Sequence, residues 1–176
     1  ADHMEDASEV VNEIRAMGGH AIAIPVDVTK EVDIIAMFEE AERHLGPVRG
    51  LVNAAGMPHA SPVCDFKFED IDRLMRVNVV GLLICCREAA KRMSTSKGGD
   101  GGSIVNISST SAISGEGALH YAASKAALTG MTRAMAVDLG PTVRVNAIEP
   151  AAIATPAPIM IKPSTIPVKI AGLPAS

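Results

Sequence analysis

Apolar and polar residues alternate along the first third of the chain with two different periods. Residues 6–17 and 31–45 repeat apolar side chains at the spacing of one helix face, and each segment ends at a glycine. A short apolar run of strand length follows each of them, over residues 20–28 and 48–54. The pattern therefore predicts the order helix, strand, helix, strand.

The same alternation continues to residue 148. A helical region over 66–93 leads through a glycine-rich loop to a strand over 103–107, and a helix over 118–139 leads to a strand over 143–148. Strands that alternate with helices of this length favour right-handed βαβ units. The predicted fold class is therefore α/β, with helices on both faces of a doubly wound parallel sheet.

The end of the chain has a different character, because five prolines fall between residues 152 and 176. Proline removes a backbone hydrogen-bond donor and breaks helices, so this density excludes a long helix. We expect one domain over residues 1–155, followed by a proline-rich tail over 156–176 that is extended or disordered.

Composition excludes several classes of partner. The chain is 48% hydrophobic but only 2% aromatic, which predicts an aliphatic core. Its net charge of -4 provides no basic surface for nucleic acid. The three cysteines have neither disulfide nor zinc spacing, and no apolar run approaches the roughly 20 residues of a membrane span. We expect a cytoplasmic protein that binds no metal, nucleic acid or membrane.

Tyr121, the only tyrosine, and Lys125 stand four residues apart on the predicted helix over 118–139. This spacing puts both side chains on one helix face. A cation beside a phenol favours the phenolate form, so the pair can pass a proton to or from an alcohol or a carbonyl. A chance pair on a solvated helix face is the alternative interpretation.

Small and polar residues end several predicted strands, at the edge where open α/β sheets bind ligands. The tetrapeptide Asn-Ala-Ala-Gly (53–56) lets a flat ligand approach the backbone, or forms an ordinary tight turn. Ser108 and Ser109 bring hydroxyl groups to the same edge. Asp27 offers a carboxylate there, which binds a ligand amino group, accepts from a neighbouring N–H, or caps the next helix.

Asn78 lies within the otherwise apolar helical region over 66–93. Asparagine has a low helix propensity, and a buried side-chain amide must form hydrogen bonds. We therefore expect Asn78 either to bind a local carbonyl or to organise a water molecule.

Five short motifs follow one another along the chain. They are N-A-A-G (53–56), R-V-N-V-V-G (76–81), N-I-S-S (106–109), Y-A-A-S-K (121–125) and R-V-N-A-I-E-P (144–150). Their order and spacing resemble the classical short-chain dehydrogenases/reductases over residues 1 to about 155. The resemblance implies a three-layer Rossmann-like fold, and an oxidoreductase that interconverts a secondary alcohol and a carbonyl by hydride transfer with NAD(P).

The resemblance also implies a role for each catalytic residue. Tyr121 is the acid/base, and Lys125 binds the nicotinamide ribose and favours the phenolate. Asn78 holds a water that extends the proton relay, and Ser109 orients the substrate oxygen. Ser108 remains an alternative to Ser109, because the stretch to Tyr121 is one residue shorter than is common in the family.

For the cofactor, the resemblance implies NAD rather than NADP, because Asp2 stands where NAD-preferring members bind the adenosine ribose. A cap for the first helix is the alternative role of Asp2. The other residues expected to contact the cofactor are Asp27, Val28, Asn53, Ala54, Ala55, Gly56, Tyr121, Lys125, Pro150 and Thr155.

The chain departs from the family pattern at both ends. It lacks the glycine-rich T-G-x-x-x-G-x-G loop with the first strand and helix, and also the last strand, so we expect a truncated domain that binds NAD weakly. The implied partners are a small-molecule alcohol or ketone and, for the full-length form, further copies in a homodimer or homotetramer. A catalytically inactive fragment that acts only in subunit association is the alternative function.

Overall fold

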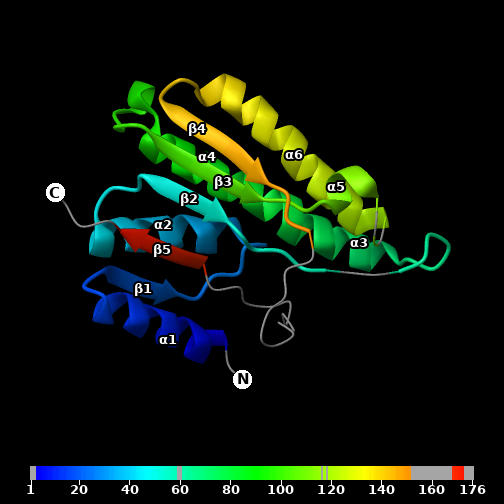
Figure 1. Ribbon diagram of the computed structural model, residues 1–176, viewed down its shortest axis with the longest axis horizontal. Helices are drawn as coiled ribbons and strands as arrows, with labels where there is room; N and C mark the ends of the chain where they lie inside the picture. The colour runs from blue at the N-terminus through cyan, green and yellow to red at the C-terminus, as the bar shows by residue number, and fades with distance from the viewer. Residues whose placement is uncertain (1–2, 59–60, 116, 118, 152–167, 173–176) are drawn as a thin grey trace.

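The computed structural model describes residues 3–58, 61–115, 117, 119–151 and 168–172, arranged as Figure 1 shows. The described helices are α1 (His3–Ala16), α2 (Glu31–Leu45), α3 (Phe68–Met75), the π-helix η1 (Arg76–Gly81), α4 (Leu82–Met93), the 3-10 helix η2 (Thr95–Lys97), α5 (Ser111–Ser114) and α6 (Leu119–Leu139). The described strands are β1 (His20–Ile24), β2 (Gly50–Asn53), β3 (Gly102–Ile107), β4 (Val143–Ile148) and β5 (Val168–Gly172).

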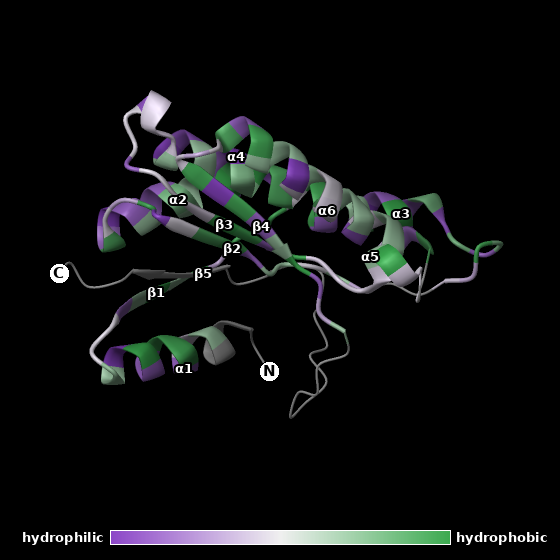
Figure 2. Cartoon of the chain, turned by 45° about the horizontal axis from the view of Figure 1, so that its top comes forward, coloured by the Kyte–Doolittle hydropathy of each residue, from purple (hydrophilic) through white to green (hydrophobic). Residues whose placement is uncertain are grey.

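Strands β2, β3 and β4 form a parallel sheet in that order. Asn53 of β2 is opposite Asn106 of β3, which is opposite Ala147 of β4, so the carboxyl ends of the three strands lie together. Figure 2 shows α2, α4 and α6 on one side of the strands and α1 on the other. Helix α1 packs against β1 rather than against these three strands. The parallel sheet with helices packed on it, in an α/β chain whose solved neighbours are short-chain dehydrogenases, confirms the predicted α/β fold class.

Strand β1 differs from the prediction in its length and its partner. It ends at Ile24 because Pro25 has no N–H to donate to a ladder. It pairs antiparallel with β5 in a separate two-stranded sheet, with Ile22 opposite Ile170, whereas a parallel pairing was expected. Figure 1 shows β5 between β1 and β2. An extended segment paired in this way covers a strand edge that would otherwise be open.

The strand β5 belongs to the predicted tail over 156–176. The pairing of these five residues was not expected, because the surrounding prolines dominate the local pattern. Residues 152–167 and 173–176 lie outside the described residues, and so does the expected domain boundary at 155.

The long helical region over 66–93 is not one regular α-helix. The π-helical turn η1 separates α3 from α4, and it contains Asn78 and Gly81, two residues with low helix propensity. A π-turn adds a residue to the helical turn and often occurs at functional sites. Asn78, which lies within this turn, has no exposed surface.

The core is mostly aliphatic, as the composition predicts, with Phe38 as a buried aromatic residue. Its largest fully buried side chains include Ile34, Phe38, Leu74, Leu82 and Ile104, each at most 1% exposed. Burying a side chain of this size stabilises the fold by roughly 1.5–3 kcal/mol. No helix in the described part of the chain has both the length and the apolar character needed to cross a membrane.

A buried carboxylate on α4 binds the arginine that links this helix to α2. The side chain of Glu88 is 5% exposed and accepts hydrogen bonds from Arg87, Lys91 and Arg92 at 2.8–3.0 Å. Arg92 also donates to Glu42 of α2 at 2.8 Å. A buried charge is tolerated only when it is paired and hydrogen-bonded, and Glu88 meets that condition with three cations.

Acid is expected to weaken the fold through Glu88. Burial alone would raise the pKa of this carboxyl, but the hydrogen bonds from Lys91, Arg92 and Arg87 outweigh it and lower the pKa from 4.5 to about 2. A group whose pKa is lower in the folded state stabilises the fold fully above its unfolded pKa. That contribution is therefore lost as the pH falls from about 4.5 toward 2.

Urea unfolding of Glu88→Gln and of the parent at a series of pH values measures this effect. The variant is expected to lose about 2–4 kcal/mol of unfolding free energy at neutral pH and to depend less on pH in acid. Glu39→Gln, at an exposed position on α2, is the matched control and should change stability by less than about 0.5 kcal/mol. Parallel acid profiles for the parent and Glu88→Gln would contradict the prediction.

Candidate active site

Tyr121 and Lys125 lie side by side on α6, as their four-residue spacing predicts. The Nζ atom of Lys125 is 5.7 Å from the centre of the Tyr121 ring, within the range of a cation–π contact. The same atom donates a hydrogen bond of 2.9 Å to the carbonyl of Ile107, the last residue of β3. The cation is thus held between the phenol ring and the end of the strand.

Burial shapes the chemistry of Lys125. The residue is 6% exposed, and its removal from water lowers the pKa of the ammonium group below the ordinary value of 10.5. An ammonium group has three N–H donors, so the bond to Ile107 leaves donors for the hydroxyl groups of a ligand.

Asn78 binds the backbone of the loop that follows β2. Its Oδ1 accepts from the N–H of Met57 at 2.8 Å, and its Nδ2 donates to the carbonyl of Met57 at 3.1 Å and to Ser124 Oγ at 3.1 Å. The sequence predicted a bond to a local carbonyl, whereas the bonded carbonyl belongs to Met57, 21 residues before Asn78. Both Nδ2 hydrogens are used in this way, so a water organised by Asn78 would bind Oδ1 or the main-chain oxygen of Asn78.

Gly56 brings the end of the Asn-Ala-Ala-Gly tetrapeptide to the same place. A Cβ added at Gly56 would lie 3.5 Å from both Asn78 Oδ1 and Lys125 Nζ, which is ordinary van der Waals contact. The tetrapeptide, Asn78 and the helix pair thus converge, although they come from β2, η1 and α6. Because Gly56 has no side chain, a ligand can approach these two polar atoms.

The two candidate serines have different surroundings. Ser108 is 4% exposed, and its hydroxyl donates to the carbonyl of Lys125 at 2.9 Å, which ties β3 to α6. Ser109 is half-buried, and its Oγ contacts the hydroxyl and the N–H of Ser111 at 3.1 and 3.2 Å. The Ser108 hydroxyl is therefore used in a hydrogen bond to α6, and Ser109 is the more accessible of the two serines.

Asp27 makes local contacts at the start of the segment that leads into α2. Its Oδ1 accepts from the N–H and the hydroxyl of Thr29 at 3.0 and 2.7 Å, and Lys30 lies 3.5 Å away. Burial would raise the pKa of Asp27, but the bonds to Thr29 and Lys30 outweigh it and lower that pKa. The alternative in which Asp27 caps the helix is wrong, because Lys30 occupies the N-cap position of α2.

Two of the predicted cofactor residues direct their side chains into the protein. Val28 is 3% exposed and belongs to the hydrophobic core, which leaves its main chain for any ligand. Asn53 is 4% exposed and donates its amide to Asn106 Oδ1 at 2.9 Å and to Cys86 Sγ at 3.1 Å. The contacts of Asn53 therefore link β2 to β3 and to α4.

Small residues remain accessible at the edge of the sheet. Ala54 is exposed, and Ala55 and Pro150 are half-buried. Asp2 and Thr155, for which the sequence also predicts cofactor contacts, lie outside the described residues.

The sequence missed several residues that hold the candidate site together. Ser124 accepts from Asn78 and donates to the carbonyl of Tyr121 at 2.7 Å, and its place between Tyr121 and Lys125 was the available signal. Asn106 was noticed only as part of the N-I-S-S motif, with no role of its own, and Thr132 was not singled out, because a lone polar residue in a helix has no local signature.

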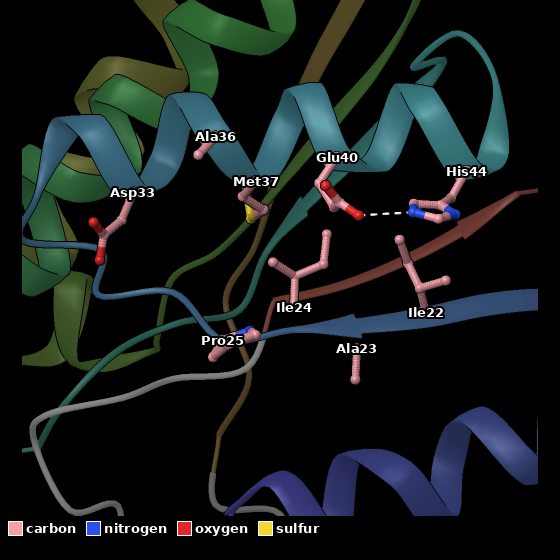
Figure 3. Close-up of a pocket in the computed structure, with 9 residues that line it drawn as sticks. All are labelled: Ile22, Ala23, Ile24, Pro25, Asp33, Ala36, Met37, Glu40 and His44. Atoms are coloured by element: carbon pink, nitrogen blue, oxygen red, sulfur yellow. Dashed lines mark ion pairs between the residues drawn. The ribbon is translucent and has the colours of Figure 1, made fainter.

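A separate hollow lies between β1 and α2, with a volume of about 600 Å³. Figure 3 shows Ile22 and Ile24 of β1 beneath Met37, Glu40 and His44 of α2. His44 Nε2 lies 2.7 Å from Glu40 Oε1. Among the described residues, none that the sequence predicts for the active site lines this hollow.

Comparisons with known proteins agree on one family. The sequence model described as short chain dehydrogenase matches residues 1–163. Uncharacterized oxidoreductase YgfF of Escherichia coli is 37% identical over 157 residues, which cover 87% of this chain and 64% of that protein. The 3-oxoacyl-[acyl-carrier-protein] reductase of Mus musculus is 38% identical over 141 residues, covering 79% of this chain and 58% of that protein.

The solved structures give the same result. A dehydrogenase/reductase from Sinorhizobium meliloti superimposes with a TM-score of 0.78 at 36% identity, covering 84% of this chain and 58% of that one. The chain therefore spans about three fifths of the length of these relatives, at 58–64%.

Proposed function

We propose an oxidoreductase function on one premise: this chain belongs to the short-chain dehydrogenase family, whose sequence model matches residues 1–163. The proposed reaction interconverts a secondary alcohol and a carbonyl by hydride transfer with NAD(P). The mouse relative supports this reaction, because its name describes the reduction of a 3-oxo group. The proposal applies to the whole protein, since the relatives are longer than this chain.

One observation carries the proposal more than any other. Lys125 Nζ stands 5.7 Å from the centre of the Tyr121 ring, and 3.5 Å from the position of a Cβ at Gly56. A phenol that exchanges protons, a cation and an open backbone position therefore meet at the carboxyl ends of β2 and β3. That arrangement is suited to moving a proton at a substrate oxygen while a ligand lies against the loop.

The residues present fit the nicotinamide half of the cofactor. Lys125 has N–H donors for ribose hydroxyls, and Ala55 and Gly56 allow close approach to the backbone. When bound, the cofactor supplies or accepts the hydride. The sequence contains no T-G-x-x-x-G-x-G loop for the pyrophosphate, so we expect the 176-residue chain to bind NAD weakly.

The chain's own residues divide the proton chemistry between them. Tyr121 gives a proton to the substrate oxygen during reduction, and takes it back during oxidation. The charge of Lys125 favours the phenolate that this exchange requires. The half-buried hydroxyl of Ser109 orients the substrate oxygen by a hydrogen bond. Asn78 extends the proton path to a water through its oxygen atoms, and holds the loop at Met57 in place.

NAD is the proposed cofactor, on the strength of the acidic Asp2 in the sequence. A small-molecule alcohol or ketone is the proposed substrate, and a homodimer or homotetramer the proposed assembly of the full-length protein. An inactive fragment that acts only in association is not favoured, because the relatives carry the names of oxidoreductases.

The proposed function is tested with a panel of secondary alcohols, sugars, steroids and ketoacyl compounds. Turnover by the whole protein is followed by nicotinamide absorbance, with NAD or NADP at millimolar concentration. Ser109→Ala and Ser108→Ala form a matched pair: the first should lower turnover roughly 100-fold or more at unchanged stability, and the second should mainly lower stability. Absence of turnover by the whole protein with every compound would contradict the proposed function. An unimpaired Ser109→Ala variant would contradict the assignment of Ser109.

A further inference from the structure

A buried polar cluster links three secondary-structure elements to β3, and Asn106 is at its centre. Asn106 has no exposed surface, and its Nδ2 donates to Thr132 Oγ1 of α6 at 2.8 Å. Its Oδ1 accepts from Asn53 Nδ2 of β2 at 2.9 Å. The thiol of Cys86 in α4 completes the cluster, 3.6 Å from the same oxygen. We call these four residues the Asn106 cluster.

Every bond in the cluster has a defined direction. The hydroxyl of Thr132 accepts from Asn106 and donates to the carbonyl of Leu128 at 2.8 Å, so both of its roles are used. Burial, opposed by the contacts to Asn53 and Asn106, raises the pKa of the Cys86 thiol to about 11, so it keeps its proton and can donate at neutral pH. Apolar side chains would fill the same space without the cost of burying amides.

Directional bonds restrain a helix in a way that apolar packing does not. Thr132 follows Tyr121 by 11 residues, which is about three turns at roughly 3.6 residues per turn, so the two residues share one face of α6. Lys125, seven residues before Thr132, lies on that face as well. A hydrogen bond that fixes Thr132 against β3 therefore restrains both the rotation and the axial position of the helix that carries Tyr121 and Lys125.

The other arm of the cluster reaches the loop on which the site depends. Asn53 is both the last residue of β2 and the first residue of the tetrapeptide that ends at Gly56. Asn53 and Asn106 are opposite each other in the parallel ladder, so their side chains project from the same face of the sheet. A single side chain, Asn106, thus contacts both the loop and the helix that converge at Lys125.

We propose that Asn106 is a positioning residue for the active site: through Thr132 it sets the placement of α6, and through Asn53 the placement of the loop at Gly56. The effect of this positioning on catalysis rests on the proposed function, whereas the spectroscopic test of the positioning does not. The amide touches neither Tyr121 nor Lys125 directly, and it acts by holding the distance between the helix and the loop.

The test uses Tyr121 itself as the reporter, because the chain has one tyrosine and no tryptophan. The 176-residue chain is labelled with 3-fluorotyrosine, which gives a single fluorine resonance, and acrylamide quenching of the tyrosine emission is measured on the unlabelled chain. Thr132→Val keeps the shape of the side chain and removes both hydrogen bonds. It is expected to shift or broaden the fluorine resonance and to raise the quenching constant about twofold, at a temperature where the chain is folded.

Matched variants separate positioning from simple loss of stability. Thr132→Ser retains the hydroxyl and should restore the parent spectrum, whereas Asn106→Leu breaks the link from the other end and should reproduce the effect of Thr132→Val. Thr142→Val and Asn146→Leu make the same chemical changes at exposed positions and should leave the resonance unchanged. A parent-like resonance and quenching constant in folded Thr132→Val or Asn106→Leu, with only a lower unfolding midpoint, would overturn the proposal.

Neither readout requires cofactor or substrate. A whole protein without oxidoreductase activity would contradict the proposed function, while the 176-residue chain would still give these spectra. Conversely, an active enzyme whose Thr132→Val variant shows no spectral change would leave the proposed function intact and remove the positioning role of Asn106.

Discussion

Tyr121→Phe is expected to lower turnover by about 1,000-fold, within the range that loss of a positioned general acid or base produces. Phenylalanine keeps the ring that packs against the hydrophobic core and lies beside Lys125, so the structure around the site should survive. The variant removes only the hydroxyl that carries the proton. Steady-state turnover measured by nicotinamide absorbance, with the best substrate of the panel, gives the value.

Controls for this prediction come from the same helix. The unfolding midpoint of Tyr121→Phe should match that of the parent, which shows that lost turnover is not lost protein. Val137→Ala changes a residue that is 86% exposed on α6, and it should retain turnover. If Tyr121→Phe kept more than about a tenth of the parent activity, Tyr121 would not be the acid/base.

Gly81→Ala is expected to destabilise the protein by about 3 kcal/mol or more. A Cβ at Gly81 would lie 2.4 Å from the carbonyl oxygen of Val28, and 3.2 Å from two further Val28 atoms. The obstacle includes backbone, which cannot move aside as a flexible side chain can, so η1 or the segment at Val28 must shift. Urea unfolding monitored by circular dichroism measures the loss.

Gly130→Ala is the matched control, and its predicted effect has the opposite sign. Nothing lies within 4 Å of a Cβ added at Gly130, which is exposed on α6. Alanine has the higher helix propensity, so this variant should gain up to about 1 kcal/mol. Equal stabilities for the two variants would mean that η1 does not pack against Val28 as closely as the structure has it. Because η1 carries Asn78, Gly81→Ala should also disturb the loop at Met57.

Periodicity and residue type predicted much of the fold, because these features depend on the local chain. The ends of α2 and β4 agree with the prediction, since the apolar pattern and the residues that end each element lie within a few positions of one another. The proximity of Tyr121 and Lys125 follows from helical geometry alone. The family could be inferred for the same reason, because its motifs are short and their order survives in the sequence.

The antiparallel pairing of β1 with β5 could not be predicted in this way. The two strands are separated by more than 140 residues, and no local pattern specifies which strand edges meet. The π-turn η1 was hidden for a related reason. Its geometry depends on what α3 and α4 pack against, including the close approach of Gly81 to Val28.

By itself, the sequence determined the order of the main helices and strands up to residue 148, which family the chain resembles and which residue types are available for chemistry. Only the tertiary structure decided where the polar side chains point: Asn53 toward Asn106, Ser108 into the contact with α6, and Asn78 onto the backbone of Met57. Each of these bonds joins residues at least 17 positions apart. A hydrogen bond needs distance and direction together, and for such residues both are set by the packing of whole elements.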